Sequence, residues 1–205
     1  MKNILLLILL ITVSFLFGQT PMSEAEAKSF IAKVTADSKN LKTLQADFVQ
    51  TKKVSFMDKN AVSSGKMALQ FPNLLSWKYT KPTLYSIVFR ENRIYINNRG
   101  KQSSVDAKNK RFEKLNKLIV GTASGRLFND PDFIVRYFKN GGYNIARFIP
   151  KSQTLLRYIK YVELSFTDGQ STVSQVNMVE DSGDATIINF KNAKVNAPIP
   201  ADAFL

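Results

Sequence analysis

The segment LQFPNLLSWKYTKP, residues 69–82, decides the fold because large apolar side chains alternate with small or polar ones on both sides of a proline turn. The apolar series is Met67, Leu69 and Phe71 before Pro72-Asn73, and Leu75, Trp77 and Tyr79 after it. A period of two residues is typical of β-strands that have one apolar face. The segment therefore predicts two strands whose apolar faces form either ordinary core or the wall of an apolar cavity.

Similar alternation recurs along most of the chain and predicts a mainly antiparallel β fold. The expected strands cover residues 44–56, 65–71, 74–80, 84–90, 92–98, 143–150, 160–170, 171–182 and 185–195. Tight turns are expected at residues 91–92, 167–170 and 180–184, where Asn, Asp, Ser and Gly gather. Serial antiparallel strands of this number usually curl into a barrel or a bent sheet. We expect an α+β fold, an incomplete barrel with helices inside it or across its mouth.

The first eighteen residues have the layout of a secretory signal peptide. A single Lys2 precedes an apolar run over residues 4–17, and small and polar residues follow it. The run is shorter than the roughly 20 residues that a membrane-spanning helix needs. We expect cleavage after Gly18, export to a bacterial periplasm, and one domain over residues 19–205, since no linker interrupts them.

Three helices are predicted in the exported part. Ser23 and Glu26 form a capping box ahead of an amphipathic helix that ends near residue 39. Residues 108–121 predict a basic helix with one apolar face, made by Phe112, Leu115, Leu118 and Ile119. Residues 129–142 predict a third, short helix that begins near Pro131 and ends at Gly141. The basic face of the second helix is either simply solvated or a contact surface for anionic head groups or for an acidic membrane transporter.

The composition excludes most catalytic chemistry. The 205 residues contain no His and no Cys, so a Ser-His-Asp triad, a Cys-His pair, an ordinary zinc site and disulfides are all ruled out. Asp181 and Asp184 are the nearest candidates for a carboxylate pair, but their sequence context is typical of a hairpin turn. We therefore expect a protein that is not an enzyme and has neither a cofactor nor a metal site.

The charge balance favours an anionic partner. Lys and Arg number 29 against 16 Asp and Glu, a net charge of +13, and loss of Lys2 with the signal peptide leaves +12. Nucleic acid, phospholipid and acidic proteins all fit such a charge. Export makes nucleic acid an improbable partner, and the sequence contains no phosphate-binding glycine loop.

Three blocks of sequence resemble the LolA family of periplasmic lipoprotein carriers. They are ADFVQTK at residues 46–52, SGKMALQFPNLLSWKYTKP at residues 64–82 and FKNAKVNAPIPADAF at residues 190–204. The resemblance implies an incomplete barrel of about 11 strands with a helical lid over an apolar cavity. In that cavity the family holds the acyl chains of lipoproteins. The lid would correspond to residues 112–138.

The same resemblance implies which side chains meet the guest. The expected cavity residues are Phe48, Met67, Leu69, Phe71, Leu75, Trp77, Tyr79, Ile87 and Phe89, and the expected lid residues are Phe112, Leu115, Leu118 and Ile119. Trp77 matches the family's tryptophan, and Leu75 stands where the family usually has Phe. Phe71 stands where the family commonly has an arginine that latches the lid, and a Phe side chain cannot donate that hydrogen bond.

The implied function is a monomeric periplasmic chaperone that carries lipoproteins from the inner to the outer membrane. Its implied partners are acylated lipoproteins, an inner-membrane ABC transporter that releases them, and an outer-membrane receptor. An alternative is a binding module or sensor for another amphiphile, such as a glycolipid or a lipid-linked pigment. Both functions need the same cavity, so the sequence does not separate them.

Overall fold

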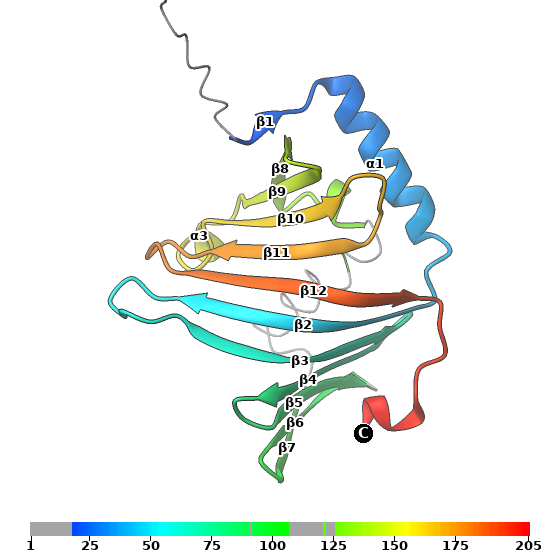
Figure 1. Cartoon of the computed structure of the whole chain (residues 1–205), viewed down its shortest axis with the longest axis vertical. Coiled ribbons are helices and arrows are strands. Elements are labelled where there is room, and N and C mark those ends of the chain that lie inside the picture. Colours follow the sequence, from blue (N-terminus) through cyan, green and yellow to red (C-terminus); the bar gives the residue numbers. More distant parts are fainter. Residues whose placement is uncertain (1–17, 91, 107–120, 122–125) are drawn as a thin grey trace, which may run out of the picture.

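A computed structural model describes residues 18–90, 92–106, 121 and 126–205, and these form one large antiparallel sheet with short helices around it (Figure 1). The strands are β1 (Thr20–Pro21), β2 (Thr43–Lys53), β3 (Ala61–Gln70), β4 (Leu74–Lys81), β5 (Tyr85–Arg90), β6 (Arg93–Asn98), β7 (Lys101–Asp106), β8 (Phe133–Asn140), β9 (Tyr143–Pro150), β10 (Tyr161–Thr167), β11 (Val173–Val179) and β12 (Ala185–Val195). The helices are α1 (Glu24–Ser38), α3 (Gln153–Leu156), and the 3-10 turns η1 (Arg126–Asn129) and η2 (Ala201–Phe204).

The sheet consists of two meanders joined in the middle. Its strand order is β1-β8-β9-β10-β11-β12-β2-β3-β4-β5-β6-β7. The seam is the long pairing of β12 with β2, which runs from Ala185 opposite Lys53 to Val195 opposite Leu44. Among the described residues, the outermost strands β1 and β7 do not pair with each other. The expected incomplete barrel is therefore confirmed, with eleven longer strands and the two-residue β1.

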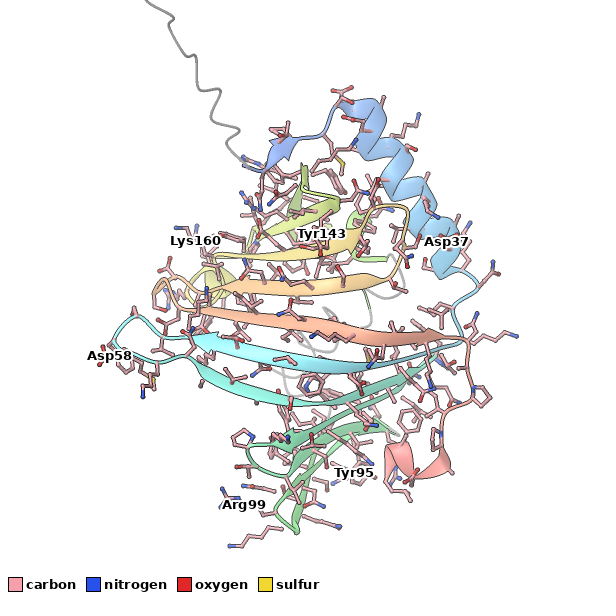
Figure 2. The ribbon with its side chains drawn as sticks, viewed as in Figure 1. Asp37, Asp58, Tyr95, Arg99, Tyr143 and Lys160 are labelled. Atoms are coloured by element: carbon pink, nitrogen blue, oxygen red, sulfur yellow. The ribbon has the colours of Figure 1, made fainter. Side chains whose placement is uncertain are left out.

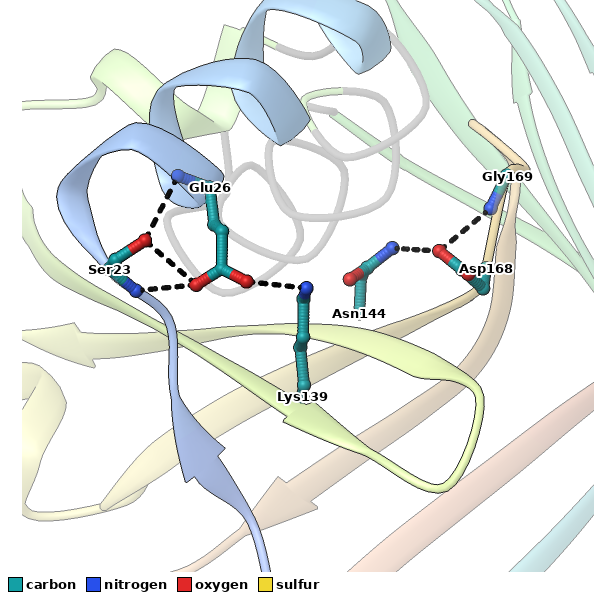
Figure 3. A network of polar contacts seen from close by, with 6 residues as sticks. All are labelled: Ser23, Glu26, Lys139, Asn144, Asp168 and Gly169. Carbon is teal, nitrogen blue, oxygen red and sulfur yellow. Dashed lines mark hydrogen bonds and ion pairs between the residues drawn. The ribbon is translucent and has the colours of Figure 1, made fainter.

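Helix α1 begins as its sequence predicts. The Ser23 N–H donates to Glu26 Oε2 over 2.8 Å, and Ser23 Oγ accepts from the Glu26 N–H over 3.4 Å, which completes the capping box. Glu26 Oε1 also lies 2.7 Å from Lys139 Nζ, so the cap ties the helix to β8 (Figure 3). The Lys139 ammonium, with the Ser23 N–H and hydroxyl, lowers the pKa of Glu26 to about 2.

The predicted tight turns also form. Gly169 and Gly183 have φ values of 75° and 88° in the β10–β11 and β11–β12 connections. Asn92, with φ of 62°, lies in the β5–β6 hairpin, where Arg90 pairs with Arg93. A positive φ suits Gly and Asn because it crowds the Cβ of most other residues. These turns set the register of the strands that follow them.

The third predicted helix, in residues 129–142, is wrong. Phe133–Asn140 is strand β8, and it pairs along its whole length with β9. Val135 and Tyr137 point toward the core while Ile134 and Arg136 are exposed, which is the period of a strand. Gly141 and Gly142, with φ of 51° and 86°, make a hairpin turn instead of ending a helix. The expected lid therefore does not extend over residues 133–138 as a helix.

Two apolar clusters divide the interior, and a third lies on the outer face. The first combines Phe30 and Val34 of α1 with η1 and the inner faces of β9 and β10. The second combines the inner faces of β2 to β6, from Leu44 to Ile94. On the outer face η2 places Phe204 against Ala68 and Val88. None of the helices in the described parts of the chain is long and apolar enough to cross a membrane.

Candidate functional site

A cavity of about 630 Å³ lies between the two meanders. Its lining runs along one face of the sheet, from β10 to β12 on one side of the β12–β2 seam and from β2 to β5 on the other, while the last turn of α1 and the β10–β11 turn border one end. Figure 2 shows Asp37, a residue of that border, at the end of the sheet opposite Asp58 in the β2–β3 loop. The inner face of this one sheet, with its alternating apolar side chains, thus borders a space that those side chains do not fill.

Seven of the nine residues that the sequence predicted for the cavity line it. They are Met67, Leu69, Leu75, Trp77, Tyr79, Ile87 and Phe89. Phe48 and Phe71 belong to the same apolar cluster but are not among the lining residues. Phe48 is only 1% exposed and lies against Trp77, with the two ring centroids 4.6 Å apart. Phe71 begins the β3–β4 turn and donates its N–H to the Lys42 carbonyl over 2.9 Å.

The predicted lid residues are not part of the cavity as described. Phe112, Leu115, Leu118 and Ile119 lie outside the described residues, as does the whole predicted basic helix apart from Gly121. The last part of the predicted lid is strand β8, which packs on the first apolar cluster rather than on the cavity wall formed by β2 to β5.

Sequence reasoning missed the part of the lining that β10 to β12 form. Its apolar members are Val162, Leu164, Val173, Val176, Met178, Ile188, Phe190, Ala193 and Val195. Their alternation in β10, β11 and β12 was visible as an apolar face. To bring that face to the same cavity as Trp77, one has to know that β12 pairs with β2. The two strands lie more than a hundred residues apart in the chain. A periodicity reports which side chains share a face, but not which other face they meet.

A tight approach of two strands positions the tyrosine of the cavity. Gly65 in β3 lies opposite Tyr79 in β4, and the register shifts between Ser64 and Gly65. A Cβ at Gly65 would lie 1.9 Å from the Lys78 carbonyl oxygen, so only glycine permits this approach. The Tyr79 hydroxyl then donates to Gln50 Oε1 of β2 over 3.0 Å.

The cavity wall contains one buried polar atom without a partner. Trp77 is 7% exposed, and its Nε1 makes no hydrogen bond among the described residues. Burial raises the pKa of the Tyr79 hydroxyl, while the nearby Trp77 indole and Gln50 act in the opposite direction.

A polar contact closes the border of the cavity at the end of α1. Asp37 Oδ2 accepts from the Ser171 hydroxyl of the β10–β11 turn and from Lys33 Nζ, the latter over 2.9 Å. The Ser171 hydroxyl, followed by the Lys33 ammonium, lowers the pKa of Asp37. The contact connects the helix to the hairpin across the cavity border, since Asp37 and Ser171 both line the space.

The main buried charges lie on the outer face of the sheet, away from the cavity. Glu163 is 7% exposed and pairs with Arg147, whose Nη2 lies 2.6 Å from Glu163 Oε1. Gln19 and Asn177 donate to the same carboxylate over 3.0 and 3.1 Å. Arg147 also stacks over Phe138, 4.6 Å from the ring centroid. Every charge is thus paired, which makes this group a structural contact.

The acidic turn at residues 180–184 also has a structural role. Asp184 Oδ1 accepts from the Ser55 N–H over 2.9 Å, and this bond lowers the pKa of Asp184. The Asp184 carboxylate therefore joins the β11–β12 turn to the β2–β3 loop. Within the described ranges, no three acidic side chains come together as a metal site would require.

Comparison with known proteins finds one family whose sequence profile matches the chain. The sequence profile of the family described as "Outer membrane lipoprotein carrier protein LolA" matches residues 39–205. The Pseudomonas aeruginosa MucA/MucB complex contains a chain of similar fold, with a TM-score of 0.53, 11% identity, and coverage of 87% of this chain and 60% of that chain. No curated protein matches the sequence.

Two further solved structures are similar at lower scores. One is a LolA superfamily protein from Nitrosomonas europaea, with a TM-score of 0.45, 10% identity, and coverage of 87% of this chain and 97% of that chain. The other is a putative outer membrane lipoprotein-sorting protein domain from Vibrio parahaemolyticus, with a TM-score of 0.49, 7% identity, and coverage of 86% and 94%.

Proposed function

The chain belongs to the LolA family of outer membrane lipoprotein carrier proteins, and from this membership we propose that its cavity binds the acyl chains of lipoproteins. The protein would carry them through the periplasm from the inner to the outer membrane. The observation that supports the proposal most directly is the cavity itself, about 630 Å³ along the apolar inner face of the sheet. Such a space suits a guest that is flexible, apolar and long.

The energetics of the guest explain why a carrier needs this cavity. Each methylene removed from water contributes about 0.8 kcal/mol, so a dozen buried methylenes are worth roughly 10 kcal/mol. A lipoprotein cannot cross an aqueous compartment at useful speed while its acyl chains are exposed. Leu69, Leu75, Ile188 and similar wall residues make van der Waals contacts that do not depend on orientation. An acyl chain can therefore slide into the cavity and out of it.

The proposal includes the surroundings in which the carrier works. Residues 1–18 act as a cleaved signal peptide, and the remaining chain is periplasmic. An inner-membrane ABC transporter loads it, and an outer-membrane receptor accepts the cargo. The excess of 29 basic over 16 acidic residues helps the carrier to approach anionic head groups. The protein performs no chemistry on its cargo.

The test is to identify what the protein holds when it is purified from a periplasmic extract, by native mass spectrometry. We expect a lipoprotein on the wild type and none on Leu75→Glu, because a carboxylate in the wall opposes an acyl chain. Gln70→Glu is the matched control, since Gln70 lies near Leu75 but is exposed. It should keep the cargo. Recovery of a glycolipid or pigment instead of a lipoprotein would replace the carrier function by the alternative one.

A further inference from the structure

The cavity is not uniformly apolar, because three polar side chains meet on one part of its wall. Trp77 and Tyr79 lie two residues apart on β4, so both point inward, and Gln50 of β2 reaches the Tyr79 hydroxyl. Phe48 supports both rings from β2, with centroids 4.6 Å from Trp77 and 5.1 Å from Tyr79. The packing leaves the two aromatic side chains little freedom to turn away from the cavity.

These three side chains retain unused donors. The Trp77 indole N–H is buried and has no acceptor within the parts of the chain that the structure describes. The Tyr79 hydroxyl and the Gln50 amide share one hydrogen bond of 3.0 Å. In either orientation of the amide, the pair still has at least one further N–H or O–H to donate. A buried donor that has no protein partner and lies in a cavity wall is available to an acceptor on the guest.

The rest of the wall defines what kind of acceptor fits. The neighbouring lining residues are apolar, and the described lining residues include neither Lys nor Arg. An anionic carboxylate would therefore enter the cavity without a positive charge to stabilise it. A neutral carbonyl oxygen directly attached to an apolar chain meets both conditions. The ester and amide groups that join fatty acyl chains to a carrier molecule have this chemistry.

We propose that Trp77 Nε1 donates a hydrogen bond to the carbonyl oxygen of an acyl ester or amide, and that the Tyr79–Gln50 pair provides a second contact to the linkage. The inference rests on the proposed function, since it requires acyl chains in the cavity. It adds that the cavity distinguishes an acylated guest from an equally apolar alkyl guest. The hydrogen bonds would also set how deeply the acyl chain is inserted, because they hold its ester or amide group beside β4.

The test compares two lipids that differ only in this carbonyl group. Monopalmitoylglycerol has an ester carbonyl, and 1-O-hexadecylglycerol has an ether in its place. Trp77 is the only tryptophan, so its fluorescence reports binding to the wild type directly. Isothermal titration calorimetry measures the variants. We expect the wild type to bind the ester about fivefold more tightly than the ether, as one gained hydrogen bond implies.

Three variants assign the preference to its residues. Trp77→Phe keeps an aromatic ring but removes the N–H, and it should lose most of the preference for the ester. Tyr79→Phe should lose part of the preference, and it tests the inference even if Trp77→Phe does not fold. Tyr95→Phe is the control, because Tyr95 packs with the cluster on the outer face. This variant should keep the full preference.

The outcomes separate this inference from the proposed function. Equal binding of ester and ether by the wild type would overturn the inference and leave acyl-chain binding intact. Binding of neither lipid would contradict the proposed function itself. Palmitate binding more tightly than monopalmitoylglycerol would show that the site recognises a carboxylate, which also overturns the inference. A preference that persists in both Trp77→Phe and Tyr79→Phe would show that other groups recognise the linkage.

Discussion

The two halves of the sheet use the same alternating pattern but enclose different things. In the C-terminal half, Phe30 of α1 fills the interior, and its ring lies 5.2 Å from Phe166 and 5.9 Å from Phe128. In the N-terminal half, Trp77 rests on Phe48 on one side and borders the cavity on the other. Around Phe30 the C-terminal half forms a packed aromatic core, whereas the inner face of β2 to β5, together with part of β10 to β12, borders an open space.

The exposed fraction of a side chain does not reveal this difference. Phe166 in the aromatic core is 0% exposed, while Leu69 and Leu75 in the cavity wall are 0% and 1% exposed. What differs is the neighbour on the inner side, which is another ring for Phe166 and cavity for Leu75. The comparison teaches that burial and packing are separate quantities. Substitutions should therefore affect the two halves differently.

The largest expected effect is the loss of folding in Phe166→Glu. A carboxylate at this position would be surrounded by Phe30, Phe128 and other apolar side chains. The cost of burying it is several kcal/mol, comparable to the whole stability of a typical domain. We expect no cooperative thermal transition by circular dichroism. A cooperative transition close to that of the wild type would show that this half is not a packed core.

The same substitution in the cavity wall should be much milder. A glutamate in Leu75→Glu borders an open space, where it can take up a proton or bind water. We expect a cooperative thermal transition at a lower temperature than in the wild type. If Leu75→Glu were as unfolded as Phe166→Glu, the distinction between wall and core would be lost.

A smaller effect is expected at the border between the halves. Ser171→Ala removes the hydroxyl that binds Asp37 and thereby frees the β10–β11 turn from α1. We expect dissociation of monopalmitoylglycerol to accelerate about two- to fivefold, by stopped-flow fluorescence, as the loss of one hydrogen bond allows. Lys33→Ala is the matched control, because it breaks only the pair within the helix. An equal acceleration in both variants would argue against a role of the Ser171 contact.

The smallest effect concerns the cap of α1, which holds the helix over the aromatic core. The folded-state pKa of Glu26 is about 2, below its ordinary value of 4.5. Its contribution to stability should therefore be complete above pH 4.5 and disappear as the pH falls through about 2. The difference in urea stability between wild type and Glu26→Gln should show this profile. A difference that does not change with pH would contradict the assignment.

Local features of this protein were predictable because neighbours in the sequence decide them. The Ser23–Glu26 cap, the turns at Gly169 and Gly183 and the inward series from Met67 to Tyr79 all depend on residues a few positions apart. The helix prediction for residues 133–140 was wrong because a proline before them and a glycine after them are compatible with both a helix and a hairpin. Strand β7 was not predicted, since KQSSVD is almost entirely exposed and does not alternate.

By itself, the sequence determined which residues share an apolar face, and with them most of the strands and one wall of the cavity. Only the tertiary structure decided what lies opposite each face. The β12–β2 seam brings Phe190 and Ile188 into the same cluster as Trp77, while α1 brings Phe30 onto Phe166. The physical reason is that periodicity acts within one strand, whereas a cavity or a core results from contacts between distant segments.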